Sequence, residues 1–339
     1  MSPRDNKIDV LKGMLTLGMV FAHTIQFLDG SYNPILQAVS TYTNLVSFSG
    51  FLGCFGFACW IAYLSKQSIP WKKVSSTVVK CYFAFVLSGI AFRYFVSGQS
   101  LDLEGIMKIV GLRDIPGYSE FLIAFALITV ASCIFAPLLR LLVADIRRVC
   151  VFSLAILVFA QFLPQTFIYD PWIGLLLGGS EFSYFPIVLY SPIFVIGAWI
   201  AHSQHKYSII SLSAAIVLVL IFSMLTFAEI SVDRFPPDAI WLIASSSLAY
   251  IYLGLSIFIT DKCPRWIKLY LNSVGQNVLY YLLFSNIVLF ICYYLGVRGT
   301  FTTVQTCVAY FCLMGIIYFS QWISVDFSSA NRAVKSNLK

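Results

Sequence analysis

Charged residues are scarce in this sequence. Only 11% of its 339 residues are Asp, Glu, Lys or Arg, whereas a soluble globular domain carries roughly a quarter. Apolar residues make up 59% of the chain. This composition excludes a soluble globular protein and predicts an integral membrane protein with several spanning helices.

Several motifs are also missing. There is no basic run interleaved with aromatic residues, so the net charge of +7 does not indicate a nucleic-acid partner. The nine cysteines form no CxxC and no Cys/His cluster, which favours a packing role and predicts no metal site. No A-x-A-like site follows the first apolar run, so we expect no cleavable signal peptide. No repeat or polar domain interrupts the chain, which predicts one membrane domain over residues 1–339.

Apolar runs of about 20 residues predict an all-α transmembrane bundle with about ten spans. The predicted spans are 8–28, 42–64, 76–97, 118–142, 149–163, 184–201, 208–229, 239–260, 273–297 and 302–322. Seventeen of the 22 Lys and Arg residues lie at one set of alternating span ends. Because cytoplasmic loops hold most basic residues, both termini are predicted to be cytoplasmic. The other set of ends holds Arg93, Lys108, Arg113, Arg234 and Arg298.

The first span carries Lys12 and His23, eleven residues apart, besides Asp9 at its start. This spacing corresponds to about 16 Å along a helix. Ionisable side chains inside lipid cost several kcal/mol and usually have a partner, a cavity or a function. Of the three histidines, only His23 lies well inside a predicted span. From the residues alone, it either pairs helices or takes part in chemistry.

A specific pattern surrounds these residues. Ile8-Asp9-x-Leu11-Lys12-Gly13 is followed by His23, fourteen positions after Asp9. This pattern resembles the first-helix signature of the membrane-bound acyltransferase-3 family, written I-D-x-L-R-G with a histidine at this distance. The segments beginning at Trp71, Phe185 and Gly275 resemble later parts of the family, so the resemblance covers nearly the whole chain.

The resemblance implies an enzyme of the bacterial inner membrane. Such an enzyme would move an acyl group, commonly acetyl from acetyl-CoA, to a hydroxyl of a cell-surface or lipid-linked saccharide. The family's functional histidine and arginine map onto His23 and Lys12, and its third-helix R-x-x-R pair maps onto Thr77 and Lys80. This chain departs from the family at Lys12 and Thr77. It also has Ser285 before Asn286 where many relatives have a histidine.

The residues are compatible with this chemistry, because a neutral histidine can accept the proton of an attacking hydroxyl. We expect His23 to be this base. Glu120, at the external end of the fourth span, would accept a hydrogen bond from the imidazole. The alternative for Glu120 is an interfacial carboxylate that faces water.

The remaining candidate residues are cations. Lys12, Lys73 and Lys80 are predicted to bind the phosphates of coenzyme A, or else they only satisfy the positive-inside rule. Arg93 and Arg234, near the external side, are predicted to bind the acceptor, or else they are interfacial cations.

Other function classes remain open at this point. A flippase or polymerase of lipid-linked oligosaccharide would also have many spans and basic cytoplasmic loops. A transporter would more often show inverted repeats with broken helices. Within the acyltransferase class, the donor could carry succinyl or a longer acyl chain. The acyl group would cross the membrane through a cavity or on a covalent carrier.

Overall fold

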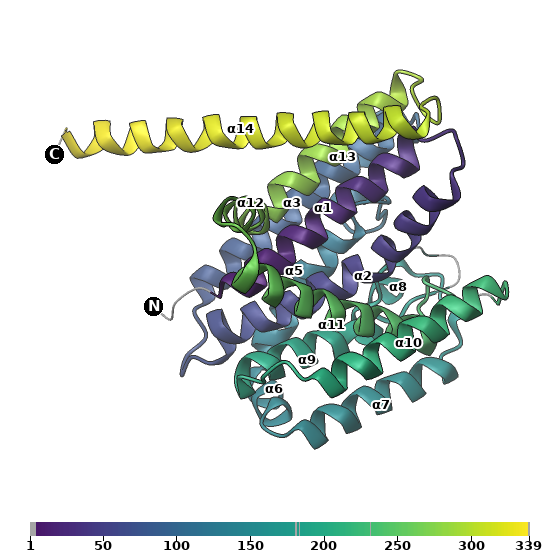
Figure 1. Cartoon of the computed structure of the whole chain (residues 1–339), viewed down its shortest axis with the longest axis vertical. Helices are drawn as coiled ribbons and strands as arrows, with labels where there is room; N and C mark the ends of the chain where they lie inside the picture. Colours follow the sequence, from purple (N-terminus) through teal and green to yellow (C-terminus); the bar gives the residue numbers. More distant parts are fainter. Residues whose placement is uncertain (1–4, 180–181, 183, 231, 338–339) are drawn as a thin grey trace.

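The computed structural model describes residues 5–179, 182, 184–230 and 232–337. These residues form helices and no β-strand (Figure 1). The helices are α1 (Asn6–Leu28), α2 (Pro34–Cys59), η1 (Trp60–Leu64), α3 (Trp71–Phe95), α4 (Leu103–Val110), α5 (Glu120–Ile134), α6 (Ala136–Val143), α7 (Ile146–Phe162), η2 (Gln165–Phe167), α8 (Pro171–Leu177), α9 (Ile187–Ser203), α10 (Ile209–Phe227), α11 (Ala239–Lys262), α12 (Arg265–Gln276), α13 (Val278–Tyr294) and α14 (Thr303–Asn337). The predicted all-α class is confirmed.

Six helices in the described residues are long and apolar enough to cross a membrane. They are α1, α2 with η1, α3, α10, α11 and the segment Thr303–Ile323 of α14. The number rises to eight if each of two bent helix pairs is one span. The helices in the remaining two predicted spans, α7 and α9, have 17 residues each. The chain is therefore a multi-pass membrane protein by helix length and composition, and ten spans with cytoplasmic termini stay predictions.

The predicted span 118–142 is not one straight helix. It is α5 followed by α6, with an angle of 86° between them. Pro137 lies in the first turn of α6, where its missing N–H costs nothing, but it cannot continue the hydrogen bonds of α5. A similar bend of 77° separates α12 from α13 at Asn277. Helix α6 is therefore nearly perpendicular to α5, and α12 is steeply inclined to α13.

Helix α1 lies in the centre of the bundle and packs against α2, α11, α12 and α13 (Figure 1). Most of its side chains are buried, which places its polar residues inside the protein rather than against lipid. Its end after Leu28 is held by the segment between α13 and α14. There, Phe301 donates its N–H to the carbonyl of Leu28 at 2.9 Å and accepts from Gly30 N–H at 2.9 Å.

Candidate functional site

His23 is buried in the interior of the bundle with 4% of its surface exposed. Its Nδ1 lies 2.9 Å from Oδ1 of Asn286, which is on α13. The Nδ2 of Asn286 donates to the backbone carbonyl of Tyr118 at 3.1 Å. The imidazole is therefore oriented by the side-chain amide of Asn286, which is itself held by its hydrogen bond to the carbonyl of Tyr118.

This chain of hydrogen bonds determines which imidazole nitrogen carries the proton. A backbone carbonyl only accepts, so the amide group that faces Tyr118 must be the NH₂. The oxygen of Asn286 then faces His23 and needs a donor, which is Nδ1–H. In the neutral imidazole this leaves the lone pair on Nε2. His23 is thus held in the tautomer whose Nε2 can accept a proton.

Tyr118 closes one side of His23. Its ring meets the imidazole edge to face, with 4.8 Å between ring centroids. Its backbone has φ +62°, which is unusual for a bulky residue and typical of a position held in place by its surroundings. Burial raises the pKa of Tyr118 to about 12, so its hydroxyl stays protonated and donates to Oε1 of Gln26 at 3.1 Å.

Glu120 is buried two residues after Tyr118, with 9% of its surface exposed. Within the described chain, no hydrogen bond joins Glu120 to His23, and Nδ1 bonds Asn286 instead. The prediction that Glu120 orients the imidazole is therefore wrong, because the amide of Asn286 occupies that position. The Oε2 atom of Glu120 is buried and has no hydrogen-bond partner among the described residues.

Arg234 lies in the loop between α10 and α11. Its guanidinium is 5.2 Å from the ring centroid of Phe185 and 4.7 Å from that of Phe235. Burial lowers the pKa of Arg234, while nearby Tyr190, Glu120 and Tyr118 raise it. Arg234 and Glu120 are thus close enough to interact electrostatically, yet no ion pair joins them in the described chain. The buried Nε of Arg234 also has no hydrogen-bond partner there.

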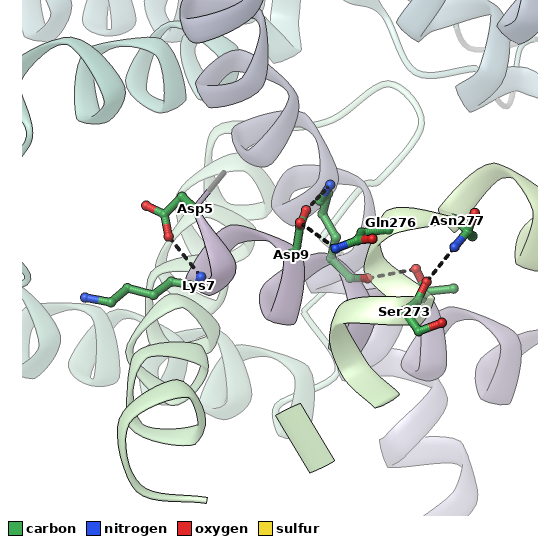
Figure 2. Close-up of polar contacts among 8 residues, drawn as sticks. Asp5, Lys7, Asp9, Ser273, Gln276 and Asn277 are labelled. Carbon is green, nitrogen blue, oxygen red and sulfur yellow. Dashed lines mark hydrogen bonds and ion pairs between the residues drawn. The ribbon is translucent and has the colours of Figure 1, made fainter. Parts of the chain in front are cut away.

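A second polar cluster, of Asp9, Lys12 and Gln276, lies about three to four turns from His23 toward the N-terminus of α1. Lys12 Nζ is 2.7 Å from Oδ1 of Asp9, whose side chain is 3% exposed. Gln276, at the end of α12, donates to Oδ2 of Asp9 at 3.4 Å (Figure 2). Helices α1 and α12 approach so closely here that a Cβ on Gly275 would lie 1.8 Å from the carbonyl oxygen of Asp9.

A cavity of about 240 Å³ adjoins this second cluster. Lys12 and Gln276 line one part of it. Leu122, which follows Glu120 by two residues, and Leu282, one turn before Asn286, line another. The cavity is therefore lined by Lys12 of the second cluster and by neighbours in sequence of Glu120 and Asn286, but not by His23, Glu120 or Asn286 themselves. Its remaining lining is apolar or aromatic and comes from Phe51, Cys54, Phe55, Ala58, Cys81, Phe121, Phe125, Gly275, Val278 and Leu279.

The other predicted cations lie apart from this cavity. Lys73 and Lys80 are exposed on α3, and neither lines it. Arg93, at the end of α3, forms a two-pronged ion pair with Asp114, in which Nε donates to Oδ2 at 2.8 Å and Nη2 contacts Oδ1. The structure therefore places His23, Glu120 and Arg234 in one region, and it places Lys12 in the lining of the cavity.

Sequence reasoning did not assign Asn286, Tyr118 and Asp9 to the site. Asn286 carried a signal, because it is an amide inside the otherwise apolar run of α13. Tyr118 carried none, since the hydrogen bond that it accepts from Asn286 is made by its backbone carbonyl. Among the described His, Cys, Asp and Glu residues, no group of three could hold a metal ion. Comparison of the chain with protein-family models, curated proteins and solved structures finds no match.

Proposed function

We propose that this protein is an integral membrane O-acyltransferase that moves an acyl group from coenzyme A to a saccharide hydroxyl. The proposed acyl group is acetyl. The observation that carries the proposal is the buried His23 imidazole, held by Asn286 with its Nε2 lone pair available. The resemblance of the first span to the acyltransferase-3 signature supports the same reaction.

In the proposed reaction, Nε2 of His23 takes the proton of the acceptor hydroxyl as its oxygen bonds to the carbonyl carbon of the thioester. The carbon–sulfur bond then breaks, and the departing thiolate takes the proton back from the imidazolium. Asn286 contributes by accepting from Nδ1–H throughout, which stabilises the imidazolium that forms between the two steps.

The donor is proposed to approach from the side of Lys12. The ammonium group offers a point charge to a phosphate, although its partner Asp9 already offsets part of that charge. The cavity of about 240 Å³ beside Lys12 offers space for the acyl-bearing arm of the donor. The exposed Lys73 and Lys80 would attract the nucleotide part of coenzyme A near its entry.

The acceptor is proposed to bind near Glu120 and Arg234. Each has a buried polar atom without a hydrogen-bond partner in the described chain. A sugar hydroxyl both donates and accepts, so neighbouring hydroxyls can bond a carboxylate oxygen and a guanidinium N–H together. Leaving such atoms unpaired costs about 1–3 kcal/mol each, which a bound saccharide would recover.

The test is transfer of labelled acetyl from acetyl-CoA into the surface polysaccharide of cells that express the chain. Wild type, His23→Ala and His205→Ala are compared at matched membrane abundance. His205 is the control because it is an exposed histidine outside the cluster. We expect label in wild type and His205→Ala, and a loss of about 10²–10⁴-fold in His23→Ala, the range of general base catalysis.

Two results would overturn this proposal. Equal labelling with His23→Ala would remove His23 from the reaction. No labelling by wild type with acetyl-CoA, succinyl-CoA or longer acyl-CoA donors would reject the acyltransferase and favour a carrier of lipid-linked saccharides.

A further inference from the structure

Two adjoining cavities follow the bend between α5 and α6. One, of about 350 Å³, lies between α5, α6, α7 and α9. The other, of about 400 Å³, lies between α6 and α7. Leu138, Leu142 and Phe152 line both, so the two cavities adjoin, and together they are called the α6 groove. None of its lining residues belongs to the candidate site around His23.

The α6 groove is apolar except at one end. In the inner cavity the only hydroxyl groups are those of Ser132 and Ser191, and each donates to a backbone carbonyl of its own helix, at 2.9 Å and 2.6 Å. They are therefore occupied, and the cavity offers no free donor to a polar ligand. The outer cavity is lined by Arg147 and Arg148 beside aliphatic side chains.

The two arginines are available to an anion. Arg147 and Arg148 are exposed, and neither forms an ion pair within the described part of the chain. The Nη1 of Arg148 donates to the carbonyl of Leu141 at 2.8 Å, which fixes this guanidinium at the end of α6. The nearby carboxylate of Asp145 is engaged as the cap of α7, accepting from the N–H of Arg147 at 2.9 Å.

We propose that the α6 groove binds one anionic phospholipid. The phosphate would lie against Arg147 and Arg148, and an acyl chain would fill the apolar cavity between α5, α6, α7 and α9. The 86° bend turns α6 across the direction of α5, so α6 lies along the membrane surface if α5 crosses it. Leu138 and Leu141 on α6 are 61% and 57% exposed, so the groove is open toward lipid.

Charge complementarity selects an anionic phospholipid over other occupants. A zwitterionic phospholipid would fill the same apolar cavity but would bring a cation near two arginines. A soluble phosphate would satisfy the arginines but leave the apolar cavity unfilled. This inference does not depend on the proposed acyl transfer.

The test is native mass spectrometry of the full chain in detergent, titrated with phosphatidylglycerol or phosphatidylcholine of the same acyl chains. The variant is Arg147→Gln with Arg148→Gln. The matched control is Lys262→Gln with Arg265→Gln, two exposed basic residues at the α11–α12 junction that line none of these cavities. Each arginine near an anionic phosphate contributes about 1 kcal/mol, so the double variant should bind phosphatidylglycerol about thirtyfold more weakly.

A second variant, Ser191→Phe, fills the inner cavity without changing charge. We expect it to weaken phosphatidylglycerol binding, while millimolar inorganic phosphate does not compete with the lipid. Equal affinities of wild type and the arginine variant would overturn the proposal. Equal binding of the two lipids would do the same, and full competition by inorganic phosphate would reduce the site to an anion site without a lipid.

Discussion

Replacing Asn286 by alanine tests the orientation of His23 without touching the imidazole. The change removes the acceptor 2.9 Å from Nδ1 and the donor 3.1 Å from the carbonyl of Tyr118. The imidazole then loses both its fixed tautomer and its fixed rotation. We expect kcat to fall while the KM for acetyl-CoA stays near that of wild type, because the donor is proposed to bind near Lys12.

The expected size follows from the hydrogen bond that is lost. A buried donor left without its partner costs about 1–3 kcal/mol. A cost of 1.36 kcal/mol in the transition state lowers the rate about tenfold. We therefore expect a fall of about ten- to a hundredfold in kcat, which is smaller than the fall expected for His23→Ala because the base is still present.

The matched control is Ser285→Ala, one residue away in the same helix. Ser285 is fully buried like Asn286, but its hydroxyl bonds only the carbonyl of Leu282 at 3.1 Å. We expect its activity to stay within about twofold of wild type, since a helical serine contributes little through such a bond. Labelled acetyl transfer is measured for both variants, with thermal unfolding in detergent as the check on folding. Wild-type kcat in a folded Asn286→Ala would refute the reasoning about the tautomer.

Two further predictions concern packing and the acceptor. Gly275→Ala would place a Cβ 1.8 Å from the carbonyl of Asp9, so we expect destabilisation by about 1–3 kcal/mol, whereas Gly315→Ala meets no atom within 4 Å and should gain up to about 1 kcal/mol. A melting temperature below that of wild type for Gly275→Ala and above it for Gly315→Ala would support the α1–α12 contact. Equal shifts of the melting temperature in the two variants would contradict it. Glu120→Gln keeps the shape but removes the carboxylate near Arg234. We expect a higher KM for the acceptor at unchanged KM for acetyl-CoA, and unaltered kinetics would exclude Glu120 from acceptor binding.

The sequence by itself determined the class of this protein and its most informative residue. A chain with so little charge and so many apolar runs has to form helices that satisfy their own backbone in lipid. His23 was identifiable because an ionisable residue within an apolar span is costly and therefore uncommon. Both conclusions depend on local composition and spacing, which can be read directly along the chain.

The partners of His23 were decided only by the tertiary structure. Asn286 is 263 positions away, and Tyr118 contributes a backbone carbonyl that no side-chain pattern reveals. The angle between α5 and α6 likewise depends on packing beyond Pro137. Sequence reasoning chose Glu120 as the partner because it lies at a similar depth. Depth along a helix follows from residue spacing, but the direction of a side chain depends on how the helices rotate against one another.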